Sequence, residues 1–176
     1  MKVITASILV LLVGAGVLAV LDRLGNAEDG NSPTNAPSWK SFDEGIALAR
    51  KENKKILIDV YTDWCGWCKK MDREVYADAK VMAILKTKFI VMKLNAESDE
   101  QITYNGEKLS KARFAQAVGV TGYPATLFLQ PDAKPITLLP GYVEAKRFAS
   151  ILIFVGDDHY KTISFQDYLR KSGSSN

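Results

Sequence analysis

An uninterrupted apolar run at the N-terminus is the first pattern along this chain. Residues 3–21 contain no charged side chain, whereas Lys2 precedes the run and Asp22 and Arg23 follow it. As a helix the run would be about 28 Å long, close to the ~30 Å hydrocarbon core of a bilayer. Because the positive charge lies at its N-terminal end, the pattern favours placing the rest of the chain on the outer side of a membrane.

Two interpretations of residues 1–24 stay open, a signal anchor and a cleaved signal peptide. A signal peptide has an apolar region of about 7–15 residues, and the longer run here favours the anchor. The Gly-Asn-Ala triplet at residues 25–27 is nonetheless a possible cleavage site. Residues 25–38 are rich in Gly, Asn, Ser and Pro and predict a flexible linker. We therefore expect the folded domain over residues 39–176.

Two further patterns alternate through that domain. Apolar side chains three or four positions apart predict helices, and short continuous runs rich in β-branched residues predict buried strands. The predicted helices cover residues 42–52, 66–76, 78–86, 110–118, 144–155 and 165–170. The predicted strands cover residues 56–62, 89–94, 125–129 and 136–139. This order predicts an α/β fold, in which a mixed central sheet of parallel strands and one hairpin has helices on both faces.

Composition adds mainly exclusions. The 176 residues are 47% hydrophobic and 24% charged, which is typical of a globular protein. The formal net charge is only +3 and no run of Lys and Arg is present, so we expect no nucleic-acid partner. Two cysteines and one histidine are too few for a disulfide framework, an iron–sulfur cluster or an all-cysteine zinc site.

The strongest chemical signal is the sequence Trp-Cys-Gly-Trp-Cys-Lys at residues 64–69, directly after a predicted strand and at the start of a helix. Cysteines three apart in this position lie on one helical face, and the unpaired N–H groups of the helix start favour a thiolate at Cys65. Cys65 would attack a substrate disulfide, and Cys68 would then resolve the mixed disulfide. We expect no metal here, because zinc needs four ligands and His159 is far away in sequence, although Cu(I) on two thiolates stays open.

Three segments of this sequence resemble the thioredoxins. Residues 56–69 resemble the active-site strand and helix, residues 120–126 the cis-proline loop, and residues 93–95 the end of the next strand with its buried lysine. The resemblance covers roughly residues 40–155 and is greatest to exported or membrane-tethered members, such as the C-terminal domain of the transmembrane disulfide-interchange reductases. It implies a thioredoxin fold and protein-disulfide oxidoreductase activity without a bound cofactor.

The resemblance also implies roles for the reacting residues. Cys65 matches the nucleophile and Cys68 the resolving thiol, and the two form a disulfide in the oxidised protein. Asp59 matches a buried carboxylate that exchanges a proton with the resolving cysteine, and its apolar strand would raise its pKa toward neutrality. A purely structural Asp59 paired with Lys93 is the alternative interpretation. Lys93 is then the orienting partner.

The remaining predicted site residues would bind substrate. Pro124 matches the cis-proline, and the backbone of Tyr123 before it would pair with the substrate chain. Trp64 is expected at the rim, shielding the nucleophile. Between the cysteines, Gly66 is followed by Trp67, where thioredoxins have proline and oxidising relatives often have histidine. We expect Trp67 to contact the partner protein at the surface, although it could instead pack against Tyr61 or the C-terminal segment.

Residues 95–124 and the tail after Gly156 are long for the family. The first begins with an acidic stretch that is expected to be a solvated loop, although near the active site it could select partners. In the tail, His159 follows two aspartates and could bind a metal, although a plain surface histidine is the simpler interpretation. Phe165 and Tyr168 are expected to pin the tail to the body.

The sequence therefore predicts a monomer in the cell envelope, anchored through residues 3–21 on the periplasmic side or free in the periplasm after cleavage. It would reduce disulfides in exported proteins, with electrons from a membrane donor. Two alternatives stay open: an oxidase or isomerase, and a non-catalytic binding or metallochaperone module.

Overall fold

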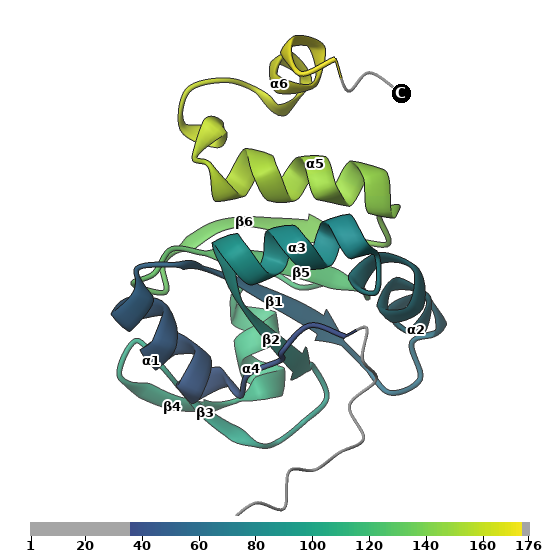
Figure 1. The fold of residues 1–176 in the computed structure, drawn as a ribbon. Coiled ribbons are helices and arrows are strands. Elements are labelled where there is room, and N and C mark those ends of the chain that lie inside the picture. Colours follow the sequence, from purple (N-terminus) through teal and green to yellow (C-terminus); the bar gives the residue numbers. More distant parts are fainter. Residues whose placement is uncertain (1–35, 174–176) are drawn as a thin grey trace, which may run out of the picture. The chain divides into compact units, whose positions relative to one another are not determined.

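A four-stranded sheet lies at the centre of the computed structural model, which describes residues 36–173 (Figure 1). Its strand order is β2-β1-β5-β6. The strands are β1 (Lys55–Tyr61), β2 (Phe89–Asn95), β5 (Ala125–Leu129) and β6 (Pro135–Pro140). Strand β1 pairs in parallel with β2 and antiparallel with β5, and β6 completes a hairpin with β5. The predicted mixed sheet is thus confirmed.

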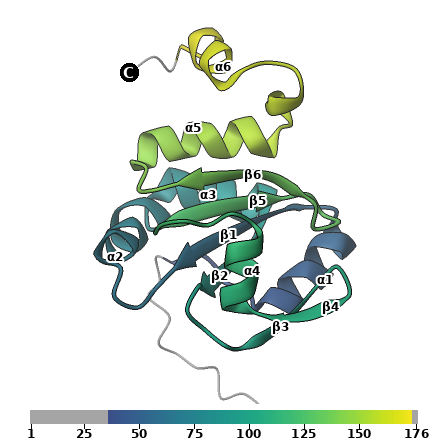
Figure 2. The same ribbon diagram turned by 180° about the vertical axis from the view of Figure 1, so that it is seen from behind.

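Helices cover both faces of this sheet (Figures 1 and 2). One core lies between the sheet and helices α1 and α4, and the other between the sheet and helices α2, α3 and α5. The helices are α1 (Phe42–Glu52), α2 (Gly66–Met71), α3 (Ala79–Lys88), α4 (Lys111–Ala117), α5 (Ala145–Gly156) and α6 (Phe165–Lys171). The predicted helix at 66–76 is present in two parts, because α2 continues into a π-helix at Asp72–Tyr76.

Strand β1 explains why the sequence pattern there is continuous rather than alternating. Ile56, Ile58 and Val60 face the core on the α1 side, while Leu57 faces the opposite core. Since successive side chains point to opposite faces of a sheet, Asp59 shares the face of Leu57, beneath the helices that follow the cysteines. All residues from 56 to 60 are buried, so the single charged side chain among them lies in an apolar setting.

A second, two-stranded sheet corrects the expectation of a solvated loop after residue 95. Strands β3 (Gln101–Tyr104) and β4 (Glu107–Ser110) form an antiparallel hairpin. Its turn, Asn105–Gly106, has φ of 51° and 86°, the left-handed values that a tight hairpin turn requires. Ile102 is buried in the first core, so this hairpin is part of the packed structure.

The C-terminal tail is packed as expected. The ring of Phe154 in α5 lies 5.2 Å from that of Phe165 and 5.4 Å from that of Tyr168. The His159 ring lies 5.0 Å from the Tyr168 ring, and Asp158 pairs with Lys55 at 3.1 Å. Among residues 36–173, no three His, Cys, Asp or Glu side chains gather in a way that could hold a metal ion.

The predicted N-terminal helix at residues 3–21 lies outside the described residues, as does most of the predicted linker. Within residues 36–173, no helix is both long enough and apolar enough to cross a membrane.

Candidate active site

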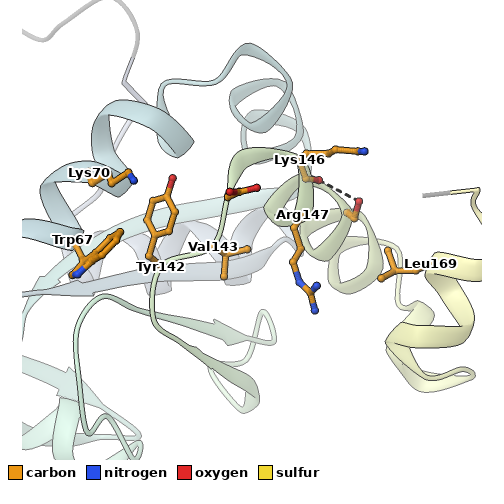
Figure 3. A pocket seen from close by; sticks show the side chains of 9 residues that line it. Trp67, Lys70, Tyr142, Val143, Lys146, Arg147 and Leu169 are labelled. Atoms are coloured by element: carbon orange, nitrogen blue, oxygen red, sulfur yellow. Dashed lines mark hydrogen bonds between the residues drawn. The ribbon is translucent and has the colours of Figure 1, made fainter. Parts of the chain in front are cut away.

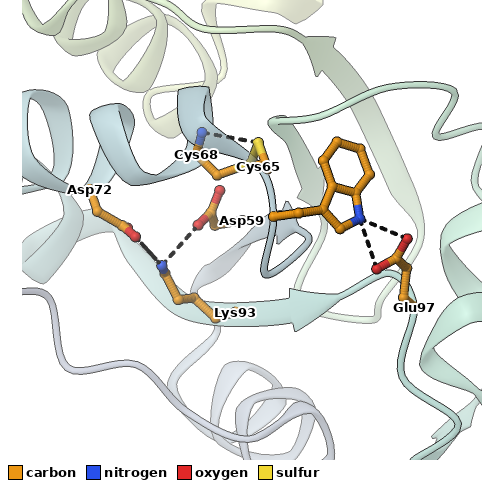
Figure 4. The surroundings of a disulfide bond; sticks show 7 residues. Asp59, Cys65, Cys68, Asp72, Lys93 and Glu97 are labelled. Atoms are coloured by element: carbon orange, nitrogen blue, oxygen red, sulfur yellow. Dashed lines mark hydrogen bonds and ion pairs between the residues drawn. A yellow bond between two sulfur atoms is a disulfide. The ribbon is translucent and has the colours of Figure 1, made fainter.

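Cys65 and Cys68 form a disulfide at the start of α2, with an S–S distance of 2.05 Å (Figure 4). Cys65 is the N-cap of the helix, and its Sγ accepts a hydrogen bond of 3.0 Å from the backbone N–H of Cys68. Each cysteine is 4% exposed. An N–H donor aimed at Sγ stabilises negative charge on that sulfur, so the geometry supports a thiolate at Cys65 once the disulfide is reduced.

The end of β1 positions these sulfurs. The chain leaves β1 at Tyr61, and the carbonyl of the buried Thr62 accepts a 3.1 Å hydrogen bond from the Cys65 N–H. A turn of residues 62–65 follows, and helix α2 then begins at Gly66. The predicted arrangement, in which the cysteines directly follow a central strand, is therefore present.

Asp59 lies in the core behind the disulfide. It is 1% exposed, and burial raises its pKa to about 6, while the nearby Lys93 ammonium counteracts part of that rise. The Asp72 carboxylate raises the pKa further. A carboxyl group with a pKa near neutrality can accept and return a proton under physiological conditions.

Lys93 is shared between two carboxylates (Figure 4). Its Nζ lies 3.4 Å from Asp59 Oδ2 but 2.6 Å from Asp72 Oδ1 and 2.7 Å from Asp72 Oδ2. The same ammonium lies over the rings of Trp39 and Tyr61, at 5.3 and 5.0 Å from their centroids. The pairing of Lys93 with Asp59 is thus present, but its shorter contact is to Asp72.

Sequence reasoning missed Asp72, although a signal for it exists. Asp72 follows Cys68 by four positions, and residues four apart lie on the same face of a helix. Any polar residue at that position therefore lies one turn beyond the resolving cysteine. The π-helix that begins at Asp72 could not be foreseen from the apolar spacing.

Two buried hydroxyl groups, those of Tyr76 and Thr126, lie near Asp59. Within the described residues, the buried oxygens Asp59 Oδ1, Tyr76 Oη and Thr126 Oγ1 have no hydrogen-bond partner, and neither does Thr62 Oγ1. Thr126 pairs directly with Asp59 across β5 and β1. Burial and the Asp59 carboxylate together raise the pKa of Tyr76 well above its usual range. The sequence analysis did not single out Tyr76 or Thr126, since only the strand pairing and the helix geometry bring them to Asp59.

Trp64 and the cis-proline loop lie on one side of the disulfide. The Tyr123–Pro124 peptide bond is cis, as predicted. The Tyr123 ring meets the indole of Trp64 edge-on at 5.9 Å. Trp64 is 67% exposed, and its Nε1 donates to both carboxylate oxygens of Glu97, at 2.9 and 3.0 Å. The acidic residue Glu97 therefore fixes an aromatic side chain next to Cys65.

Trp67 lies at the surface on another side. It is 57% exposed, and its ring lies 5.4 Å from that of Tyr142 in the loop between β6 and α5. Gly66 beside it is also exposed, and a Cβ there would meet no other atom within 4 Å. The two residues between the cysteines in sequence therefore lie on the surface, where an incoming chain can reach them.

Comparison with known proteins agrees with this fold and this site. The model of the family described as "Thioredoxin-like domain" matches residues 42–156. An uncharacterized protein of Caenorhabditis elegans is 30% identical over 107 residues, which are 61% of this chain and 14% of that protein. The "Thiol:disulfide interchange protein DsbD" of Ralstonia nicotianae is 31% identical over 119 residues, 65% of this chain and 18% of that protein.

A solved thioredoxin-fold protein from Helicobacter pylori superimposes with a TM-score of 0.59 at 20% identity, covering 70% of this chain and 88% of that one. At that identity the likeness shows the fold alone. The chain belongs to the thioredoxin-like family, and its two cysteines form a disulfide at the start of α2. It spans less than a fifth of each of the two curated relatives described above.

Proposed function

We propose that this protein reduces disulfides in exported proteins, on the outer side of a membrane to which residues 3–21 anchor it. The observation that carries the proposal is the Cys65–Cys68 pair at the start of α2, where the Cys68 N–H points at the Cys65 sulfur. That hydrogen bond favours the thiolate, which is the attacking species in thiol–disulfide exchange.

In the first step, the Cys65 thiolate attacks one sulfur of the substrate disulfide. A bond forms between Cys65 Sγ and that sulfur, the substrate S–S bond breaks, and the other substrate sulfur leaves as a thiolate that takes a proton from water. The exposed Gly66 and Trp67 leave room for the substrate chain. The backbone of Tyr123 before the cis-proline Pro124 would pair with it, as an added strand.

In the second step, Cys68 attacks Cys65 Sγ and releases the second substrate thiolate. The Cys68 thiol must first lose its proton, and Asp59 accepts it as the buried base, a role for which its pKa of about 6 is suited. Lys93 and Asp72 set how readily Asp59 ionises. The result is one reduced substrate and one Cys65–Cys68 disulfide, a transfer of two electrons.

The oxidised pair must then be reduced again, so the proposal includes an electron donor in the membrane. Relatives named thiol:disulfide interchange proteins support a place in such an electron-transfer chain. An apolar run of 19 residues preceded by a lysine supports the anchor and the outward orientation of the domain.

The equilibrium reduction potential of the Cys65–Cys68 pair tests the direction of electron flow. The full chain in detergent is equilibrated with redox buffers of known potential, and the free thiols are counted after alkylation. A value near about −270 mV supports a reductase, whereas a value near about −120 to −180 mV would mean an oxidase or isomerase. Trp67 is the reason to keep that second candidate. The residues between the two cysteines tune the reduction potential, and this position holds neither the proline of thioredoxins nor the histidine of oxidising relatives.

Turnover of insulin with a chemical reductant separates both enzymes from a binding module. Wild-type protein should accelerate insulin reduction, and Cys65→Ser should abolish the acceleration. If wild-type protein gives no turnover with any reductant, the catalytic role is wrong.

A further inference from the structure

A groove extends from Trp67 along the first turns of α5 to Leu169 of α6 (Figure 3). Its volume is about 780 Å³. The residues that line it come from α2, the loop after β6, α5 and α6: Trp67, Lys70, Tyr142, Val143, Glu144, Lys146, Arg147, Ser150 and Leu169. Because Trp64 packs on Tyr123 and Trp67 packs on Tyr142, this groove is a different surface from the cis-proline loop.

The end of the groove nearest the cysteines has an aromatic wall with a cation on it. The Lys70 ammonium lies 5.0 Å from the ring centroid of Trp67 and 5.0 Å from that of Tyr142. The hydroxyl of Tyr142 donates a 3.0 Å hydrogen bond to Glu74, which also lies 3.7 Å from Lys70. These contacts hold Trp67 and Tyr142 in place although both reach the surface.

The remainder of the groove is basic. Lys146 and Arg147 project from the first turn of α5, and both are exposed (Figure 3). Within residues 36–173, no carboxylate oxygen lies within 4.0 Å of a side-chain nitrogen of either residue. Glu144 is the one acidic side chain among the nine that line the groove, against three basic ones. The groove therefore has a surplus of positive charge that the described part of the chain does not neutralise.

We propose that this groove binds an acidic segment of the partner protein, adjacent in space to the disulfide that Cys65 attacks. The inference rests on the proposed function, since it assigns a substrate class to the same site. Charge complementarity selects the occupant: carboxylates on the segment meet Lys146 and Arg147, while its apolar side chains contact Trp67 and Leu169. Trp67 thus connects the reacting cysteines to a surface that distinguishes one partner from another.

Kinetics with matched substrates test the proposal. The full chain in detergent reduces short disulfide peptides that carry two aspartates near the cysteine, or two asparagines at the same positions. At low salt we expect kcat/KM to be about tenfold higher for the aspartate peptide, because complementary charge raises the rate of encounter. At 1 M salt, where the screening length is only about 3 Å, the two peptides should react at similar rates.

Lys146→Glu is the informative variant. A glutamate in the first turn of α5 is compatible with the helix, since negative charge is favourable near a helix N-terminus. It should remove the preference for the aspartate peptide over the asparagine peptide. Lys108→Glu in β4, which makes the same charge change at an exposed position outside the groove, should keep the preference. Arg147 is left intact because it lies 5.8 Å from the Phe165 ring of α6.

The outcomes separate this proposal from the proposed function. Equal rates for the two peptides at low salt, or the same loss in Lys146→Glu and Lys108→Glu, would overturn the groove proposal while leaving the reductase intact. If neither peptide is turned over, the proposed function fails, and a cysteine-free aspartate peptide then tests the groove directly. Its binding should shift the backbone amide signals of Lys146 and Ser150, and the absence of such shifts would overturn the groove as well.

The chain's own acidic residues Asp22, Glu28 and Asp29 are a competing occupant. Neutralising them should leave the binding of the aspartate peptide unchanged. Tighter binding after neutralisation would mean that this segment fills the groove, and the assignment to a partner protein would be wrong.

Discussion

Asp59 is a carboxyl group that the fold keeps out of water at a cost to stability. Its pKa rises from 3.8 to about 6, mainly through burial. At pH 7 Asp59 is mostly ionised, and its burial then lowers the free energy of unfolding by about 3 kcal/mol compared with low pH, where Asp59 is protonated. Since the folded protein binds the proton more tightly than the unfolded chain does, this contribution makes stability fall as pH rises from about 4 to 6.

Asp59→Asn should therefore stabilise the oxidised protein and slow its catalysis. Above pH 7 we expect the free energy of unfolding to rise by about 2–3 kcal/mol, and the gain should disappear near pH 4, where wild-type Asp59 is protonated. Urea unfolding across this pH range measures the gain. Turnover at pH 7 should fall by about 100-fold or more if Asp59 is the proton acceptor.

The exposed Asp99→Asn variant is the control and should change neither quantity. Substitution of a residue with only a structural role would not raise the free energy of unfolding and lower turnover at the same time. Unchanged turnover in Asp59→Asn would therefore contradict the catalytic assignment.

Asp72→Asn should lower the pKa of Asp59. Asp72 raises that pKa through charge repulsion, and it also holds Lys93 at 2.6 Å, closer than the 3.4 Å from Lys93 to Asp59. Without the Asp72 charge, the ammonium is free to stabilise ionised Asp59. A carbon-detected NMR titration of the Asp59 carboxyl should give a midpoint below 6, and a raised or unchanged midpoint would contradict this account.

A site residue can be predicted from the sequence only where a motif or a local pattern marks it. Cys65 and Cys68 occur in a short motif and Asp59 stands out as a charge within an apolar run, so the sequence pattern singles them out, whereas Pro124 is proposed only through the resemblance of its loop to the thioredoxins. Asp72 and Tyr142 belong to no motif. Their relation to the cysteines depends on a helical turn and on a loop that follows β6 far along the chain.

At the scale of elements, apolar periodicity located the helices and strands of the main sheet to within one or two residues. It missed the hairpin β3–β4, because these strands are short and only Ile102 and Ser110 are buried in them. The Asn-Gly pair at residues 105–106 was the available signal, since both positions of such a turn require positive φ. Hydrophobic spacing alone carries no information about turn conformation.

Gly106→Ala should test that turn. Gly106 has a φ of 86°, where a side chain is strained, and we expect the free energy of unfolding to fall by about 1 kcal/mol. Gly122→Ala is the matched control, because an added Cβ there meets no atom within 4 Å and φ is not positive. Thermal unfolding of both variants measures the difference, and equal midpoints would mean that the turn tolerates alanine.

At the scale of the whole molecule, the N-terminal residues decide where the domain acts. If residues 3–21 anchor the protein, its intact mass after extraction from cell membranes should include residues 1–27. Mass spectrometry of the membrane fraction, with the soluble envelope fraction as control, measures this directly. A protein that lacks residues 1–27 and is found in the soluble fraction would show that the segment is a cleaved signal.

The two outer strands of the main sheet have a consequence for neighbouring copies of the chain. Lys40 closes part of the free side of β2 by pairing with Met92, and its backbone N–H donates 2.9 Å to the Val91 carbonyl. On the opposite side, β6 begins and ends with prolines at positions 135 and 140, which offer no N–H to an approaching strand. Both edges of the sheet therefore offer few free backbone groups to a strand of a neighbouring copy, which disfavours extension of the sheet from one molecule into the next.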